Sequence, residues 1–187
     1  RKRLDSMEIL SENARYAVAL NALCKRNGVM VSPDFLACLA KSDSEIDDEA
    51  RLKFWSIPIP KLGMPFAAAA AKHGLIDWGF PFLFDIYCLS EPLAFVLAKH
   101  KTIPDGFQYW DAISPVTGDS LAHSALKNGT IPKNFTHWDV RDASGISVAA
   151  LAVQMGCVLD KFTAWHVVDA DGTTAAHYAA RLGKLPD

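Results

Sequence analysis

The chain has 187 residues, of which 50% are hydrophobic and 21% are charged, and its formal net charge is -2. This composition supplies enough apolar side chains for a packed core, and it excludes a disordered or collagen-like chain. The slightly acidic balance argues against a generally basic nucleic-acid-binding protein, and no apolar run approaches the roughly 18 residues of a membrane span.

A 12-residue pattern recurs along the chain, and its later copies start 27 or 28 residues apart. The copies cover residues 17–28, 63–74, 90–101, 118–129, 145–156 and 172–183. Self-similarity at a fixed period indicates a repeat architecture. We therefore predict a single repeat domain over residues 1–187, with units near 7–40, 55–82, 83–109, 110–137, 138–164 and 165–187.

The N-terminal unit differs from the inner ones. Polar residues stand where inner units carry Ala or Gly: Glu8, Glu12, Asn13 and Arg15. Because terminal repeats need a polar outer face, we predict that a first helix over about 7–27 acts as a cap. An acidic insertion at 41–53 then breaks the register, and it is expected to be a solvated surface loop or short helix, or else a docking segment.

Each unit is predicted to hold two helices joined by a turn. Hydroxyl side chains that can accept from free backbone N–H groups begin the first helix at Ser120, Ser147 and Thr174. Proline takes this place, where a missing N–H costs little, at Pro65 and Pro92. Glycine, which accepts positive φ, ends the helix at Gly74, Gly129, Gly156 and Gly183. A second, shorter helix is expected next, opened by Pro104 or Pro132 and carrying the recurrent Phe and Trp.

Small and aromatic residues keep the same register. Alanines such as Ala122 and Ala149 let helices of successive units approach to roughly 8 Å, and the Phe and Trp ladders fill the space between layers. Trp138 is accordingly predicted to be largely buried. Since no unit can bury its apolar face alone, the predicted fold is an all-α helical repeat solenoid of about six helix-turn-helix units.

These units resemble ankyrin repeats, whose pattern is G-x-T-P-L-H-x-A-A-x-x-G. The match is carried by Gly172, Thr174, His177, Ala179, Ala180 and Gly183, and nearly as well by Gly118, Ser120, His123, Ala125 and Gly129. The resemblance implies that the two histidines hydrogen-bond backbone in the turns of neighbouring units. Because an ankyrin unit has about 33 residues, the shorter units here predict a trimmed hairpin finger or a shortened second helix.

Catalytic and metal-binding patterns are not found in the sequence. No P-loop, G-x-S-x-G or H-E-x-x-H spacing occurs, and the run Asp169-Ala170-Asp171-Gly172 lacks the Gly and Glu spacing of a calcium loop. That run is predicted to be a turn with side-chain-to-backbone hydrogen bonds. We expect no enzyme, no cofactor and no metal.

The four cysteines are isolated and contain no C-x-x-C pair: Cys24, Cys38, Cys88 and Cys157. A zinc site or a dense disulfide framework is not predicted from such spacing. We expect free, buried thiols in a reducing compartment, which is the cytoplasm, or the host-cell cytoplasm if the chain belongs to a secreted bacterial effector.

One register position, two residues before the closing residue of the pattern, is rich in cations: Arg26, Lys72, Lys99, Lys127 and Arg181, with Gln154 in one unit. In ankyrin repeats this position and the next contribute to the concave binding face. The predicted partner-binding residues are Lys72, His73, Lys99, His100, Lys127, Asn128, Gln154 and Arg181. We expect the lysines to lie in a row that suits an acidic or phosphate-bearing ligand, although cations in a last helical turn also complement the helix dipole.

The function predicted from these features is non-catalytic protein–protein recognition on the concave face. The expected partner is another protein or a peptide, and an acidic one would suit the row of cations. A second hypothesis is a targeting or scaffold domain of a larger enzyme, such as a secreted bacterial effector. A third is nucleic-acid binding along the row of cations, which would show steep salt dependence. No membrane partner is predicted.

Overall fold

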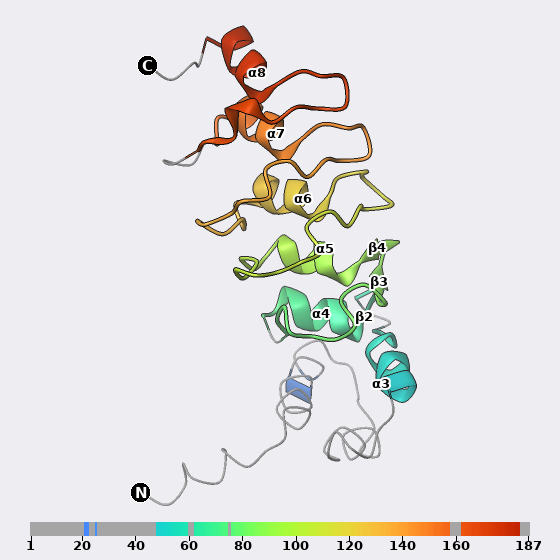
Figure 1. Ribbon diagram of the computed structural model, residues 1–187. Coiled ribbons are helices and arrows are strands. Elements are labelled where there is room, and N and C mark those ends of the chain that lie inside the picture. Colours follow the sequence, from blue (N-terminus) through green and yellow to red (C-terminus); the bar gives the residue numbers. More distant parts are fainter. Residues whose placement is uncertain are drawn as a thin grey trace, which may run out of the picture. The chain divides into compact units, whose positions relative to one another are not determined.

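The computed structural model describes residues 21–22, 25, 48–59, 62–74, 76–157 and 162–183 (Figure 1). The chain forms two compact units, Arg1–Leu89 and Ser90–Asp187. Nearly all of the predicted N-terminal cap, over about 7–27, lies outside the described residues. None of the described helices is long and apolar enough to cross a membrane.

From residue 48 onward, the described part of the first unit contains two α-helices and a small hairpin. Helix α3 (Asp48–Trp55) precedes strands β1 (Pro58–Ile59) and β2 (Met64–Pro65), which pair antiparallel with Pro58 opposite Pro65. Helix α4 (Phe66–Lys72) follows β2, buries all of its residues up to Ala71, and is followed later by strand β3 (Tyr87–Cys88). Of the acidic insertion at 41–53, the structure describes residues 48–53. They lie in helix α3, and Asp48 and Glu49 at its start are exposed.

Four short α-helices pack in chain order in the described part of the second unit. After strand β4 (Glu91–Pro92) come α5 (Leu93–Ala98), α6 (Leu121–Asn128), α7 (Val148–Met155) and α8 (Ala175–Arg181), with the 3-10 helix η2 (Ala164–His166) before α8. Each helix packs on the next, and the chain before each of α6, α7 and α8 projects as a hairpin on the same side (Figure 1). An isolated antiparallel bridge closes each hairpin: Ile113 with Ser120, Arg141 with Ser147, and Val168 with Thr174.

The predicted starts and ends of the first helices are confirmed. The side chains of Ser120 and Ser147 accept hydrogen bonds from the N–H groups of His123 and Ala150, which satisfies donors that a helix start leaves free. Thr174 and His177 form a reciprocal capping box on α8. Pro65 and Pro92 stand at the starts of α4 and α5, and the closing glycines have positive φ, at Gly74, Gly129, Gly156 and Gly183.

The prediction of an all-α solenoid of helix-turn-helix units is wrong. Among the described residues, two two-stranded sheets and the three bridged hairpins accompany the helices, so the fold mixes helix and strand. The segments from Pro104 and Pro132 onward form turns and irregular chain instead of second helices, and the described part of the next such segment makes a single 3-10 turn at Ala164–His166. A unit of 27 or 28 residues that spends several residues on a hairpin has too few left for a second α-helix, and the aromatic contacts hold the short segment in place without one.

The aromatic ladder itself is confirmed in the second unit. Trp110, Phe135, Trp138, Phe162 and Trp165 follow one another edge to face, with ring centroids 4.8 to 4.9 Å apart. Trp138 is only 8% exposed, as predicted. Edge-to-face pairs add to the burial of apolar area, so the ladder joins the irregular segments of successive repeats.

Successive hairpins are joined by backbone hydrogen bonds. Ala143 N–H donates to the carbonyl of Gly118 at 2.8 Å, and Ala170 N–H donates to that of Gly145 at 2.9 Å. Gly145 has a φ of 86°, and a β-carbon at this position would lie 2.4 Å from Cβ of Ala170. Glycine is therefore required here both by the backbone conformation and by the close approach of the next hairpin.

The described cysteines are free thiols. Cys88 is buried, as expected, but Cys157 is exposed just after α7, so the expectation that it is buried is wrong. Cys157 follows the closing glycine, where the chain has already left the packed helix. Cys24 and Cys38 lie outside the described residues.

Candidate protein-binding surface

The helix ends of the second unit form one exposed surface, here named the helix-end surface. Helices α5 and α6 bury every residue up to Ala98 and Leu126, and α7 buries all but Leu151 up to Val153. The next two residues are exposed in each of four successive repeats, and they define the helix-end surface: Lys99, His100, Lys127, Asn128, Gln154, Met155, Arg181 and Leu182.

This surface contains the predicted binding residues of the second unit, and it adds Met155 and Leu182, which share the register position of His100 and Asn128. Lys72 and His73 are likewise exposed, at the end of α4 in the first unit. The helix-end surface is confined to the second unit, so a row that joins Lys72 to Lys99 and Lys127 stays a prediction.

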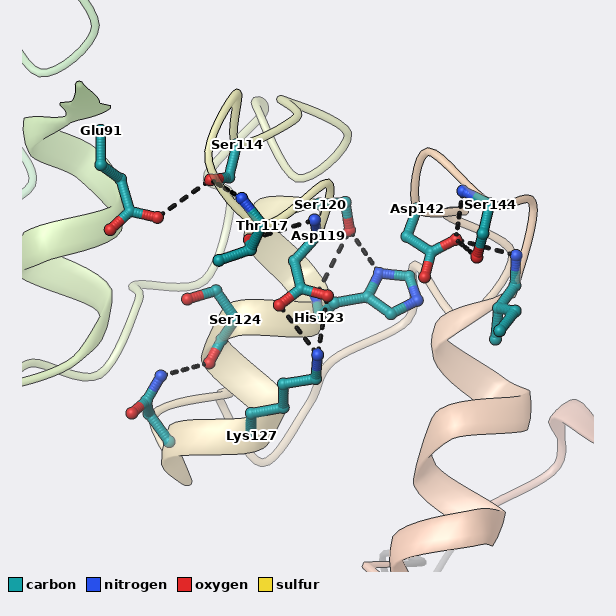
Figure 2. Close-up of polar contacts among 12 residues, drawn as sticks. Glu91, Ser114, Thr117, Asp119, Ser120, His123, Ser124, Lys127, Asp142 and Ser144 are labelled. Carbon is teal, nitrogen blue, oxygen red and sulfur yellow. Dashed lines mark hydrogen bonds and ion pairs between the residues drawn. The ribbon is translucent and has the colours of Figure 1, made fainter.

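Lys127 is held by a carboxylate of its own repeat. Its Nζ lies 2.7 and 2.8 Å from the two carboxylate oxygens of Asp119, the residue before the N-cap Ser120 (Figure 2). The lysine side chain therefore runs back along α6 toward the start of the helix, which is the direction in which helical side chains lean. Its charge lies away from the carbonyl groups that end α6, so it is poorly placed to complement the dipole there.

Lys99 repeats this arrangement one repeat earlier. Its Nζ lies 2.8 Å from Oε2 of Glu91, again eight residues earlier in the chain. The other oxygen of Glu91, Oε1, accepts a hydrogen bond of 2.9 Å from the hydroxyl of Ser114, which belongs to the next hairpin (Figure 2). Glu91 is 8% exposed, so this carboxylate links its own helix end to the following repeat from a buried position.

The C-terminal half of the helix-end surface has a different character. The residues that precede the N-caps of α7 and α8 are Ile146 and Thr173, which carry no charge, and the paired position holds Gln154 and Arg181. Within the described ranges, no carboxylate forms an ion pair with Arg181, and its guanidinium carbon lies 6.0 Å from the ring centroid of Tyr178.

Two apolar side chains are exposed on this half. Met155 is 41% exposed and Leu182 is 47% exposed, at equivalent positions on α7 and just after α8, which pack directly on each other. In the preceding repeats the same position holds His100 and Asn128. The helix-end surface therefore divides into an ion-paired half, with Lys99 and Lys127, and an apolar half that carries Arg181.

His123 lies buried at the junction of two repeats. Its ring points from α6 toward the hairpin that carries Asp142, and its Nδ1 is 2.6 Å from Oγ of Ser120 (Figure 2). Its Nε2 is buried and has no hydrogen-bond partner within geometric limits, although the backbone of Ile146 lies close enough to act on the pKa of the ring. The ring thus faces the neighbouring turn (Figure 2), as the ankyrin resemblance implies, with the backbone of Ile146 as the nearby hydrogen-bonding group.

Burial lowers the pKa of His123 below 6.5, against the opposing influence of the carboxylates of Asp142 and Asp119. Partial burial would raise the pKa of Asp142, but hydrogen bonds from Ser144 and Ile146 outweigh it and lower that pKa. Asp142 is therefore ionised at neutral pH, while His123 is neutral and buried.

The stability of the protein is expected to fall as the pH is lowered through about 6.5. Because the pKa of His123 is lower in the folded than in the unfolded chain, the unfolded chain binds more protons in this range, and stability rises with pH there. Urea unfolding at pH 7.5 and about pH 5 should show a smaller loss in His123→Gln than in the wild type. His100→Gln, at an exposed helix end, is the control for loss of a histidine, and an identical pH profile in His123→Gln and the wild type would contradict the prediction.

The run at 169–172 forms a hydrogen-bonded turn, as predicted. Asp171 Oδ1 accepts from the N–H of Thr173, while the buried Asp169 accepts from the N–H of Ser147 and from the hydroxyl of Tyr178. The hydrogen bond to Asp169 is the main reason why the pKa of Tyr178 is raised to about 12. Oδ1 of Asp169 therefore joins its repeat to the preceding one, whereas Oδ2 holds Tyr178 of its own repeat. Over the described parts of the chain, no three His, Cys, Asp or Glu side chains are grouped so as to hold a metal ion.

Comparisons with known proteins assign no family to the chain. No protein-family model matches it, and no curated protein matches it in sequence. The resemblance to ankyrin repeats therefore stays a prediction that rests on the sequence pattern.

Proposed function

We propose that the chain is a non-catalytic recognition module that binds another protein or a peptide on its helix-end surface. The observation that carries this proposal is the exposure of the same two register positions in four successive repeats, which in α5, α6 and α7 come directly after largely buried residues. A row of exposed side chains on packed, capped helices presents a preorganised surface, and preorganisation reduces the entropic cost of association.

The ankyrin resemblance supports the same surface, because it implies that these positions lie on a binding face. The mixture of side chains also supports it. Lysine, histidine, asparagine, glutamine, methionine and arginine provide hydrogen-bond donors and apolar contacts next to one another, as protein interfaces require.

A phage-displayed library of random short peptides, selected on the whole 187-residue chain, tests the proposal. Enriched peptides should lose at least about tenfold in affinity when Lys127→Glu and Gln154→Glu are combined. Both changes place a carboxylate on the surface, which repels acidic groups of the peptide and alters the shape of the contact. The matched control combines Lys133→Glu with Gln108→Glu, which are exposed loop positions of the same residue types. Failure to enrich any peptide, or equal loss in both double variants, would overturn the proposal.

A further inference from the structure

The ion pairs on the helix-end surface determine where an acidic partner group can bind. Lys99 and Lys127 each lie within 2.8 Å of a carboxylate of their own repeat. A ligand carboxylate that approached either lysine would also approach Glu91 or Asp119, so much of the attraction is cancelled.

Arg181 differs from these lysines. The residue eight positions before it is Thr173, and in the described residues its guanidinium makes no ion pair. The pKa of the Asp171 carboxyl is lowered mainly by the hydrogen bond from the N–H of Thr173, and the charge of Arg181 is the smallest cause of that lowering. A guanidinium offers a planar pair of N–H donors that fits a carboxylate in two parallel hydrogen bonds, which a single ammonium group does not. Arg181 is thus the cation of the helix-end surface in the second unit that is best able to accept a partner's carboxylate.

The apolar contacts lie on the same half. Met155 and Leu182 are exposed at equivalent positions on neighbouring helices, and Gln154 beside Met155 is neutral. Methionine adapts its shape to an apolar partner side chain, and burial of such a side chain supplies most of the affinity that a small contact can have.

We infer that the helix-end surface binds a peptide segment in which a carboxylate side chain lies close to a large aliphatic or aromatic one, the carboxylate pairing with Arg181 and the apolar side chain covering Met155 and Leu182. This inference rests on the proposed function and narrows its partner to one chemical class. The inference also confines binding to the repeats of α7 and α8. The other two cations of the helix-end surface, Lys99 and Lys127, belong to the repeats of α5 and α6.

The test uses peptides enriched from the same random library. The peptides should share an Asp or Glu near a Leu, Met, Phe or Trp, and a synthetic copy should lose at least about tenfold in affinity on Arg181→Gln and on Met155→Glu. Lys133→Gln, at an exposed loop residue outside the helix-end surface, is the matched control for loss of a cation, and Val116→Glu, at a residue 56% exposed on a hairpin, is the control for the apolar change. Both controls should bind within about twofold of the wild type, and circular dichroism melts should show that all four variants are folded.

The outcomes separate the inference from the proposed function. Peptides that lose affinity on the combined Lys127→Glu and Gln154→Glu variant, but bind Arg181→Gln and Met155→Glu normally, would leave the function standing and overturn the inference. Enriched peptides without an acidic residue would overturn it as well. A library that yields no binder would overturn both.

Discussion

Replacing Trp138 with alanine is expected to lower the free energy of unfolding by about 3–5 kcal/mol, the range seen when a buried Trp or Phe is truncated. Trp138 is 8% exposed, and its ring lies edge to face with Phe135 and Phe162, each with a centroid distance of 4.9 Å. Its removal would leave a cavity between the aromatic segments of two successive repeats. Urea denaturation followed by circular dichroism measures the loss.

The matched control for Trp138→Ala is Tyr109→Ala, because Tyr109 is an aromatic residue that also lies in the compact unit Ser90–Asp187 but is 59% exposed. Its truncation removes little buried area and should cost less than about 1 kcal/mol. Equal losses in the two variants would show that the aromatic ladder does not stabilise the packing of the repeats.

Gly145→Ala is expected to cost about 2–5 kcal/mol. The left-handed backbone at Gly145, with φ at 86°, accounts for about 1–2 kcal/mol. The new β-carbon would lie 2.4 Å from Cβ of Ala170, and relief of that overlap by moving the hairpins accounts for about 1–3 kcal/mol more. Chemical denaturation gives the total.

Two further variants separate these contributions. Gly172→Ala shares the positive φ, at 83°, but has no atom within 4 Å of the added carbon, so it should lose only the conformational part. In Gly145→Ala combined with Ala170→Gly, the overlapping carbon is removed, and the double variant should recover the part that is due to the overlap. A double variant no more stable than Gly145→Ala would contradict the close approach of the two hairpins.

Local chemistry made the first helices predictable from the sequence. A hydroxyl at Ser120, Ser147 or Thr174 and a glycine about nine residues later define the start and end of a short helix through nearby hydrogen bonds and a single backbone angle. The aromatic ladder was predictable for a similar reason, because a fixed register brings Trp138 next to the same neighbours in every repeat.

The second helices and the hairpins were not predictable in this way. Pro104 and Pro132 are as compatible with a turn as with a helix start, and the choice depends on how many residues the hairpin takes from the repeat. The bridge from Val168 to Thr174 joins only one residue pair, so it leaves no alternating pattern in the sequence.

The candidate surface was predicted in part. Register alone located Lys99, Lys127 and Arg181, but it did not indicate which of them carry a neighbouring acid. The spacing of eight between Glu91 and Lys99, and between Asp119 and Lys127, was the available signal. Eight residues is not a spacing at which side chains of one helix meet, and the contact forms because the acid precedes a helix of only two turns.

The backbone hydrogen bonds between hairpins have a consequence for local opening. The donors Ala143 and Ala170 are exposed at loop tips, where amide hydrogens usually exchange rapidly with solvent, yet each is engaged by the preceding hairpin. At the equivalent place in the first of the three bridged hairpins stands Pro115, which has no amide hydrogen to donate. The hairpins closed at Ser120, Ser147 and Thr174 are therefore coupled in their fluctuations as one cooperative segment. This cooperative segment ends at Pro115. There, Ser114 is linked to Glu91 of the preceding repeat by a side-chain hydrogen bond.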